Sequence, residues 1–415
     1  MKIAIVGSGI AGLTCAYLLN RQHDIQVFEA SDWIGGHTHT VDVQVEGRSY
    51  AIDTGFIVFN DWTYPNFIRL LEQIGVGFKP TEMSFSVSDP ATGVEYNGHD
   101  LNTLFAQRSN LLSPAFWGML RDILRFNRQS LDDLANNRIS ADTTLGQYLD
   151  SNGYGRRFIE HYIVPMGSAI WSMSLADMLG FPLQFFVRFC KNHGLLSVSD
   201  RPTWQVIEGG SRSYVAPLTA SFAERIRLNC PVSRVVRDQD GVTLHSAAGS
   251  ERFDKVIFAC HSDQALALLE QPSEQERDIL GALPYANNDV VLHTDTRLLP
   301  KRKLAWASWN YRLGGPSDQP AAVTYDMNIL QGIDSDTTFC VSLNQTAAID
   351  PNKILARFQY AHPQYSLAGT AAQARWEELL GAQHTYYCGA YWANGFHEDG
   401  VVSALRVARA FGETL

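Results

Sequence analysis

The sequence predicts a two-domain α/β fold, in which a domain of alternating strands and helices is interleaved with a discontinuous α+β domain. Residues 2–19 predict a buried strand, a glycine turn and an apolar helix in succession. A second predicted strand, 25–28, ends on Glu29, about 20 residues beyond the first glycine of the turn. Strand-like and glycine-rich segments return near residues 207, 253 and 385, so the first domain is expected to be assembled from distant segments.

The glycine turn at residues 7–12 has the spacing of a phosphate-binding loop. Gly7 permits the tight turn, Gly9 lets backbone approach a pyrophosphate, and Gly12 lets the helix lie close to the sheet. The helix start offers unpaired N–H groups to the phosphates, and Glu29 offers a carboxylate to ribose hydroxyls. A purely structural turn is the alternative. The residues expected at a dinucleotide are Gly7, Gly9, Ile10, Ala11, Gly12, Glu29 and Ala30.

A second glycine pair, Gly35-Gly36, follows Glu29 after a short loop and precedes His37 and Thr38. Nicotinamide dehydrogenases have no general need for such a pair. The order of acid, short loop, Gly-Gly, basic residue and Ser or Thr resembles the flavin amine oxidase superfamily, with His37 in the usual arginine position. The resemblance implies an amine oxidase-like, FAD-binding Rossmann-type fold and FAD contacts at Gly35, Gly36, His37 and Thr38.

The composition limits the partners that we expect. With 33 basic and 43 acidic residues the net charge is −10, which argues against nucleic acid and gives no general attraction to anionic membranes, although local patches can differ. The six cysteines form no C-x-x-C pair, so neither a disulfide framework nor a metal site is expected. Without a predicted membrane span or signal peptide, we expect a cytoplasmic protein.

Segments after the first domain's opening contain further candidate flavin contacts. A hairpin at residues 41–52 leads to Asp53-Thr54-Gly55-Phe56, and the resemblance places Asp53, Gly55 and Phe59 beside the flavin ring, with Phe56 in contact. An ordinary turn is the alternative. Residues 60–75 predict a loop and an amphipathic helix ending at a glycine, 85–98 predict strands, and a mostly helical region follows to about residue 190.

The chain is then expected to return to the dinucleotide domain. A glycine pair enters a helix at residues 207–214, residues 230–244 predict a strand, turn and strand, and residues 253–259 predict a buried strand. The resemblance assigns an adenine contact to Val232 or Val235. Residues 265–375 form a second block outside the dinucleotide domain, with expected strands that face the flavin. Its aromatic and amide residues of interest are Trp306, Trp309, Tyr325 and Asn328.

The last segment predicts a strand over 385–390 ending in Gly389, then a turn at 393–400 into a helix. In the superfamily this helix begins at the flavin pyrimidine, where its dipole stabilises negative charge. We therefore expect His397 and Asp399 at the flavin as catalytic groups for proton transfer. Simple capping or loop solvation is the alternative for His397. The other contacts implied here are Gly389, Gly400 and Val401.

Two aromatic-rich stretches, 111–126 and 179–190, predict helices. They are interpreted as core helices of the substrate domain, with an apolar tunnel wall or a membrane-grazing face as the alternative. If the substrate is an acyl chain, the tunnel-wall residues would be Phe116, Trp117, Phe181, Phe185 and Phe186. Trp171 and Trp309 would lie nearer the flavin ring.

A narrower resemblance covers nearly the whole chain. The stretches TYPN (63–66) and GFHEDG (395–400), with many others, are similar to the FAD-containing N-terminal region of plant cyclopropane fatty acid synthases and its free-standing bacterial relatives. This resemblance implies oxidation or desaturation of a methylated or cyclopropanated fatty acyl chain by hydride transfer to flavin N5. A fatty acid methyltransferase is then the expected partner, and contact with a membrane surface is left open.

Alternative functions remain at this point. A flavin amine oxidase commonly carries a lysine near flavin N5, where residues 287–295 offer Asp289 and His293 instead. A non-catalytic flavoprotein partner of a methyltransferase is a further alternative. The exact substrate, electron acceptor and oligomeric state are left open by the sequence. The expected dinucleotide-domain segments are 1–80, 204–270 and 384–415, and the substrate-domain segments are 81–203 and 271–383.

Overall fold

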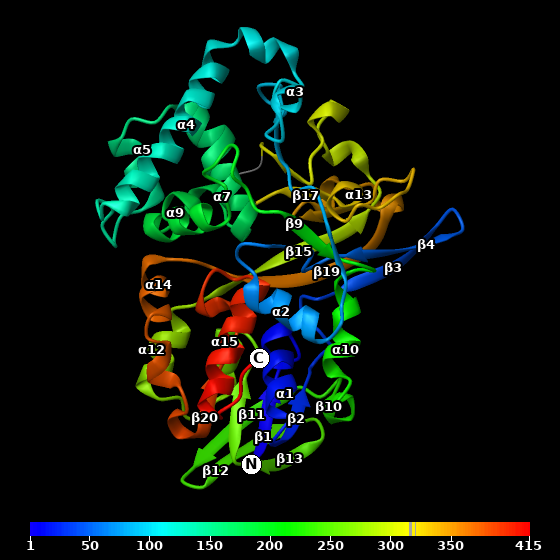
Figure 1. The fold of residues 1–415 in the computed structure, drawn as a ribbon, viewed down its shortest axis with the longest axis vertical. Coiled ribbons are helices and arrows are strands. Elements are labelled where there is room, and N and C mark those ends of the chain that lie inside the picture. Colours follow the sequence, from blue (N-terminus) through cyan, green and yellow to red (C-terminus); the bar gives the residue numbers. More distant parts are fainter. Residues whose placement is uncertain (315–317, 320) are drawn as a thin grey trace.

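The computed structural model describes residues 1–314, 318–319 and 321–415. A parallel sheet with its helices lies at the end that holds both chain termini (Figure 1). A mostly helical region occupies the opposite end, and a second, larger sheet runs between them. The two-domain α/β fold predicted from the sequence is confirmed. None of the described helices is long and apolar enough to cross a bilayer.

The parallel sheet is assembled from four distant parts of the chain. Its strands, in spatial order, are β10 (Ile226–Arg227), β2 (Asp24–Phe28), β1 (Lys2–Val6), β14 (Lys255–Phe258) and β20 (Thr385–Tyr387). Every neighbouring pair is parallel. β14 starts later than predicted because Phe253 belongs to the preceding antiparallel strand. β20 ends at Tyr387 rather than at the predicted Gly389.

Helices cover both faces of this sheet. On one face, α1 (Ile10–Leu19), α2 (Pro65–Gln73), α10 (Val215–Thr219) and α15 (His397–Ala410) share a core with Ile3 and Ile5. Ala4 and Val6 point to the other face, as alternation along a strand requires. The elements packed there are α11 (Ser262–Leu268), α12 (Glu274–Gly281), α14 (Leu367–Gln373) and the antiparallel strands β11 (Val232–Asp238), β12 (Gly241–Ser246) and β13 (Gly249–Phe253).

Two of these helices come from the segment 271–383 that was expected to belong to the substrate domain. Leu280 of α12 and Ala372 of α14 share a core with Phe258 of the parallel sheet. After β14 the chain packs α12 on the parallel sheet before it forms the second sheet, and it packs α14 there afterwards. The exact domain boundaries stay a prediction.

The second sheet has seven strands. In spatial order these are β19 (Ile354–Pro363), β15 (Tyr285–His293), β18 (Cys340–Leu343), β17 (Val323–Asp326), β16 (Trp309–Arg312), β7 (Phe85–Asp89) and β8 (Val94–Asn97). All neighbours are antiparallel except β16 and β7. This parallel pair joins residues 85–88 to residues 309–312 and ties the two predicted substrate-domain segments together.

Smaller elements link the two sheets. The predicted hairpin is present as β3 (Thr40–Val45) and β4 (Arg48–Asp53), and its turn places Glu46 and Gly47 at positive φ. A three-stranded sheet joins β5 (Val58–Asn60), β9 (Trp204–Ile207) and β6 (Phe78–Pro80), and α13 (Met327–Leu330) follows β17.

The helical region holds an aromatic core of its own. Its helices are α3 (Leu101–Leu104), α4 (Pro114–Ala135), α5 (Leu145–Ser151), α6 (Arg156–Phe158), α7 (Val164–Trp171), α8 (Leu175–Leu179) and α9 (Leu183–Asn192). Phe116, Phe181 and Phe186 are fully buried in this core, and Phe185 packs against it. These four side chains therefore pack in the core, which confirms the interpretation as core helices, and they do not form the tunnel wall of the alternative. Trp117 lies half exposed on the surface.

Candidate functional site

A cavity of about 880 Å³ is lined by residues of both the parallel sheet and the second sheet. Its volume is at the upper end of the range for ligand pockets. Val6, Phe28 and Ala259, at or just beyond the carboxyl ends of β1, β2 and β14, line one side. In open α/β sheets, ligands bind at this edge. The cavity is therefore the candidate site, and the predicted dinucleotide residues can be placed relative to it.

The glycines of the loop at residues 7–12 have two different roles. Gly7 has φ +106°, and a Cβ there would lie 2.9 Å from the carbonyl oxygen of Ala259. A Cβ at Gly12 would lie 2.1 Å from the Gly7 oxygen. At Gly9, by contrast, a Cβ would meet no described atom within 4 Å, and this residue lines the cavity. Gly7 and Gly12 hold the loop's shape, and Gly9 leaves open the space that a pyrophosphate requires.

The Glu29 carboxylate is fixed at the edge of this loop. Its Oε2 accepts hydrogen bonds from the Ser8 backbone N–H at 2.9 Å and the Ser8 hydroxyl at 2.6 Å, and Oε1 accepts from the Ser31 N–H at 2.8 Å. A carboxylate has about four acceptor positions, so one remains for a ribose hydroxyl. Ser8 was missed from the sequence, although it stands in the middle of the glycine motif.

The glycine pair Gly35-Gly36 packs directly on the glycine loop. A Cβ at Gly36 would lie 3.2 Å from the Cα of Gly9, and Gly35 has φ +124°. A Cβ at Gly55 would lie 2.2 Å from the carbonyl oxygen of His37. The three backbone segments 7–12, 35–37 and 55–56 are therefore in close contact at Gly36 and Gly55, and all three line the cavity.

A cluster of neutral aromatic groups lies beside these segments. The His37 ring lies 5.6 Å from the His362 ring, 6.2 Å from the His261 ring and 5.3 Å from the Tyr360 ring. Burial lowers the pKa of His37 and of His261 to about 4, and that of His362 to about 3. His37 therefore supplies a neutral ring at the position where the resemblance led us to expect arginine. Within the described chain, no three His, Cys, Asp or Glu side chains are grouped to hold a metal ion.

His261, His362 and Tyr360 were not among the predicted site residues. His261 lies two residues beyond the strand predicted at 253–259, so its place near the cavity could have been inferred. His362 and Tyr360 lie on β19, far along the chain, and had no local signal. The His37 Nε2 atom is buried and has no hydrogen-bond partner among the described residues. A bound ligand could satisfy it.

His397 lines the cavity at the start of α15 and is held by two hydroxyl groups. Its Nε2 lies 3.0 Å from the Thr38 Oγ1 and 3.2 Å from the Tyr214 hydroxyl, and these two oxygens lie 2.5 Å apart. The ring stacks on Phe56 with centroids 3.5 Å apart. Burial lowers the pKa of His397 well below its ordinary value, so the imidazole is neutral at pH 7. Tyr214 was missed, although its segment was recognised.

Asp399 does not line the cavity but caps its own helix. Its Oδ2 accepts hydrogen bonds from the backbone N–H groups of Phe396 at 2.9 Å and Asn394 at 3.1 Å. Burial raises the pKa of this carboxyl to about 7. The geometry thus gives Asp399 a positioning role, in place of the proton transfer expected from the sequence.

Other predicted contacts are split between cavity and core. Those that line the cavity are Gly7, Gly9, Ile10, Ala11, Glu29, Ala30, Gly35, Gly36, His37, Gly55, Phe56, Val232, Gly389 and His397, with Trp171, Trp309 and Tyr325. Those outside the lining are Gly12, Thr38, Phe59, Val235, Trp306, Asn328, Asp399, Gly400 and Val401. Gly400 packs against α1, since a Cβ there would lie 2.8 Å from Ile10 Cγ2, and Val401 is fully buried.

Asp53 also has a structural role. Its carboxylate is fully buried and accepts hydrogen bonds from Thr40, Ser211 and Gln331. Burial raises the pKa of this carboxyl to about 6. Asp53 therefore joins three segments behind the cavity and does not line it.

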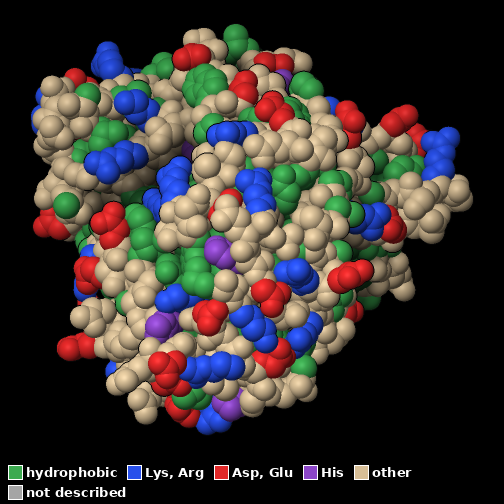
Figure 2. All heavy atoms as spheres, turned by 60° about the horizontal axis from the view of Figure 1, so that its bottom comes forward, with side chains coloured by type: hydrophobic (Ala, Val, Ile, Leu, Met, Phe, Trp, Pro, Cys, Tyr) green, Lys and Arg blue, Asp and Glu red, His purple; other side chains and the backbone are tan. Residues whose placement is uncertain are grey.

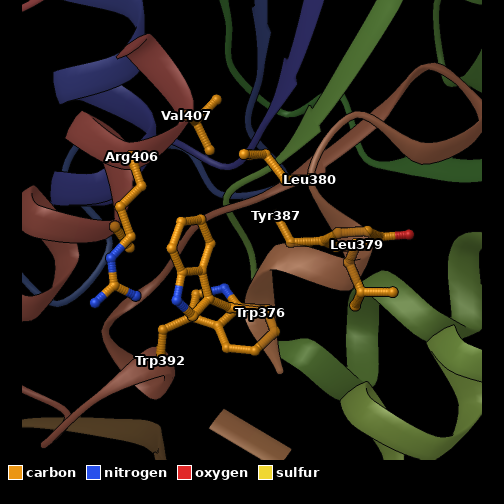
Figure 3. Close-up of a pocket in the computed structure, with 8 residues that line it drawn as sticks. Trp376, Leu379, Leu380, Tyr387, Trp392, Arg406 and Val407 are labelled. Atoms are coloured by element: carbon orange, nitrogen blue, oxygen red, sulfur yellow. The ribbon is translucent and has the colours of Figure 1, made fainter. Parts of the chain in front are cut away.

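A second pocket lies between α15 and the residues that follow α14 (Figure 3). Trp376 and Trp392 enclose it, and the Arg406 guanidinium lies 4.6 Å from the Trp376 ring. Its volume is about 10 Å³, enough for one water molecule. The large cavity is therefore the one that can hold a dinucleotide and a substrate.

The large cavity fits a dinucleotide at the glycine loop. The open space at Gly9 and the N-terminus of α1 are suited to the pyrophosphate of a dinucleotide. The fixed Glu29 carboxylate is suited to a ribose hydroxyl. The unpartnered His37 nitrogen lies in the same lining. These residues would hold FAD.

Comparison with known proteins agrees with this geometry. The family model for flavin containing amine oxidoreductases matches residues 10–328. No curated protein matches the sequence. Similar solved structures include putrescine oxidase bound to putrescine (15% identity, TM-score 0.70, 99% of each chain covered). Cyclohexylamine oxidase from Brevibacterium oxydans IH-35A matches at 16% identity and a TM-score of 0.67, covering 99% of this chain and 98% of that one.

A third similar structure is that of a CLA-producing fatty acid isomerase from P. acnes. It matches at 16% identity and a TM-score of 0.68, covering 99% of this chain and 98% of that one. At these identities the structural likenesses establish the fold, and the family model, which spans more than half of the chain, establishes the family. The chain belongs to the flavin containing amine oxidoreductases, and the protein is an FAD-dependent oxidoreductase.

Proposed function

We propose that the protein oxidises or desaturates a lipid acyl chain, such as a methylated or cyclopropanated fatty acyl group. The observation that carries this proposal is the uncharged lining of the cavity beyond the dinucleotide loop. Its apolar and aromatic residues are Ile57, Val58, Ile170, Trp171, Trp309, Tyr325, Leu330, Tyr365 and Phe396. An alkyl chain has too few polar groups to be oriented by hydrogen bonds, so apolar walls are what such a substrate needs.

The same lining disfavours a protonated amine. Moving an ammonium group out of water is costly unless an opposite charge or hydrogen bonds compensate. Glu29 is the sole Asp, Glu, Lys or Arg side chain of the lining, and it lies at the dinucleotide loop. Asp289 and His293, which occupy the stretch where amine oxidases often carry lysine, are not in the lining. Asp289 accepts a hydrogen bond from Thr346, and His293 bonds to Ser342 at 2.8 Å.

Two likenesses support a lipid substrate. The sequence resembles the FAD-containing region of plant cyclopropane fatty acid synthases, and a fatty acid isomerase shares the fold. The buried aromatic core of α4 and α9 removes one argument for a long tunnel, so the proposal rests on the side chains that line the cavity. A fatty acid methyltransferase, which would methylate the acyl substrate before this protein oxidises it, is proposed as the partner.

FAD, when bound, supplies a hydride acceptor. The residue proposed to receive the proton is His397, which is neutral and oriented through Nε2 by Thr38 and Tyr214. Nδ1 is proposed as the nitrogen that takes the proton, because Nε2 is already held by the two hydroxyl groups. Loss of hydride from one carbon and of a proton from its neighbour leaves a carbon–carbon double bond.

Anaerobic reduction of the flavin tests the proposal. The holoenzyme is mixed with methylated or cyclopropanated fatty acyl lipids, with putrescine or with cyclohexylamine, and bleaching of the flavin absorbance is followed. We expect bleaching by a lipid, with loss of two hydrogens by mass spectrometry. Bleaching by the amines alone would contradict the lipid substrate and support a flavin amine oxidase. Absence of bleaching by a whole lipid extract would instead favour a non-catalytic flavoprotein partner of a methyltransferase.

Replacement of His397 tests the proton acceptor. His397→Ala is expected to retain FAD and to lose at least about 100-fold in the rate of bleaching, the usual contribution of general base catalysis. Tyr214→Phe is the matched control, since it keeps the ring but removes one hydrogen bond, and its loss should be about tenfold or less. An unchanged rate in His397→Ala would exclude His397 as the proton acceptor.

A further inference from the structure

Large apolar side chains are exposed together at one end of the molecule. Five of the twelve exposed large apolar residues of the described chain lie between residues 101 and 124. These five residues, with their exposed fractions, are Leu101 (76%), Leu111 (47%), Leu112 (88%), Trp117 (50%) and Leu124 (58%). Together with Arg108, Arg121 and Arg128 they are called the α3–α4 surface here.

Helix α4 presents two different faces. Phe116, Met119 and Phe126 enter the aromatic core. Positions 117, 121, 124 and 128 follow one another at spacings of four, three and four residues, so they lie on one outward stripe. This stripe carries Trp117, Arg121, Leu124 and Arg128, all exposed. An outward stripe with a tryptophan, a leucine and two arginines is unlike the mixed polar face of an ordinary surface helix.

The exposed charges of the α3–α4 surface are positive. Arg121 and Arg128 have no carboxylate partner within the described chain, and Arg108 donates to Phe105 and Asn102, which are neutral. Asp122, the one acid of residues 101–128, is buried and accepts a hydrogen bond from Gly155. The exposed Asp100 lies at one margin, and at the other the exposed Asp132, one helical turn beyond Arg128, is paired with Arg138.

The positive charge of the α3–α4 surface contrasts with the net negative charge of the protein. The whole chain has a formal charge of −10. On the face shown in Figure 2, acidic and basic side chains are interspersed. The attraction of the α3–α4 surface to a negatively charged partner is therefore local.

The shape of the region suits a flat partner. Helix α3 and the beginning of α4 project at the end of the molecule opposite the chain termini (Figure 1). None of the residues of the α3–α4 surface lines either of the two pockets described above. Leu111 and Leu112 belong to the 3-10 turn Arg108–Leu112, which connects the two helices. A projecting apolar turn flanked by arginines is suited to the flat surface of a bilayer.

We propose that the α3–α4 surface docks on an anionic lipid bilayer. Leu111, Leu112 and Trp117 enter the boundary between head groups and acyl chains, where tryptophan is favoured. Arg108, Arg121 and Arg128 lie at the level of the anionic head groups. The protein then rests on one leaflet through this end, with the dinucleotide domain directed away from the membrane. This inference stands on the exposed side chains and does not depend on the proposed substrate.

Vesicle flotation tests the docking surface. The full-length holoprotein is mixed with vesicles of phosphatidylcholine alone or of phosphatidylcholine with phosphatidylglycerol, and the floating fraction is measured by flavin absorbance. We expect flotation with the anionic vesicles, weaker flotation with neutral vesicles, and loss of binding at high salt. Absence of flotation with anionic vesicles would overturn the proposal.

Matched variants locate the contact. Arg121→Glu with Arg128→Glu is expected to weaken binding by at least about tenfold, since each arginine near an anionic surface contributes roughly fivefold. Leu112→Ser with Trp117→Ser should weaken binding to both kinds of vesicle. Leu355→Ser and Arg409→Glu change exposed residues elsewhere and should bind as the unmodified protein does.

Two results would overturn the assignment even if the protein floats. One is equal flotation of the α3–α4 variants and the unmodified protein. The other is a dimer of the unmodified protein in gel filtration that the same variants convert to a monomer, since the surface would then be an interface between copies. Retention of the flavin by each variant shows that it remains folded, and substrate turnover is not needed for any of these measurements.

Discussion

The two ends of the large cavity are built in different ways. At the dinucleotide end, backbone segments 7–12, 35–37 and 55–56 approach each other so closely that most of their glycines cannot carry a Cβ. At the substrate end, side chains such as Trp171, Trp309 and Tyr365 form the wall. A site made of backbone is constrained in its sequence, whereas a site made of side chains can change its chemistry without changing the fold. This difference explains why the cofactor is readily assigned and the substrate is not.

Substitution of the loop glycines should give the largest effects and separates the two glycine roles. Gly12→Val is expected to prevent folding, because its Cβ would overlap the Gly7 oxygen and neither backbone segment can move freely. Gly9→Val should leave a folded protein without flavin, because its side chain enters the open space of the pyrophosphate site. Circular dichroism and flavin absorbance after gel filtration measure the two outcomes. Retention of FAD by Gly9→Val would show that this loop is not the phosphate site.

Truncation in the aromatic core should be the next largest effect. Phe126→Ala is expected to lower the free energy of unfolding by about 3–5 kcal/mol, because the ring is fully buried. Neither Phe126 nor the aromatic rings around it line the cavity, so flavin spectra and substrate preference should not change. Trp309→Ala is the matched variant in the cavity wall and should alter substrate preference. A changed preference in Phe126→Ala at full flavin content would contradict the separation of the aromatic core from the cavity wall.

The Asp399 carboxyl should make stability depend on pH. Burial raises its pKa in the folded state to about 7, above the ordinary value of 3.8, so the folded protein binds more protons between these values. Stability from this group is therefore greatest at low pH and is lost as the pH rises toward 7, by at most about 4 kcal/mol. Asp399→Asn should remove this decline. Denaturant unfolding from pH 5 to pH 8 compares the two proteins, and parallel curves would contradict the assignment.

Removal of the Glu29 carboxylate should give the smallest effect of the four. Glu29→Ala is expected to weaken FAD binding by roughly 1.5–3 kcal/mol, the value of hydrogen bonds to a charged group, while the phosphate site remains. Equilibrium titration of the apoprotein with FAD measures the change. If Glu29→Ala lost FAD as completely as Gly9→Val, the ribose contact would dominate binding, and the backbone would not be the main determinant of this end of the cavity.

Much of the fold was predictable because its signals are local. The glycine loop, the hairpin at residues 40–53 and the helix beginning at Pro65 each follow from short stretches with defined turn or helix signals. The aromatic helices α4 and α9 were also predicted. Their interpretation as core helices is confirmed. The tunnel-wall alternative stayed open in the sequence, because an aromatic residue on a buried helix face has the same pattern whether it packs against other rings or against a ligand.

Within the site, the residues that could be predicted were again those with a local sequence signal. His397 was identified because it stands at the start of the last helix, but its partner Tyr214 lies 183 residues earlier and was not. Asp399, two residues from His397, was expected to face the same cavity. The backbone N–H groups of Asn394 and Phe396 instead bind its carboxylate, which no pattern in the sequence distinguishes from a catalytic role.

The sequence by itself determined the dinucleotide site, because a turn that admits a pyrophosphate requires glycine at particular places along one short segment. It also indicated the order in which the chain leaves and re-enters the parallel sheet. The tertiary structure alone decided the walls of the substrate end, which come from residues 57–58, 170–172, 309, 325, 359–363, 365 and 396. It also decided which face of α4 is exposed. The physical reason is that these surfaces depend on which distant side chains pack together, and packing partners leave no spacing signal in a single sequence.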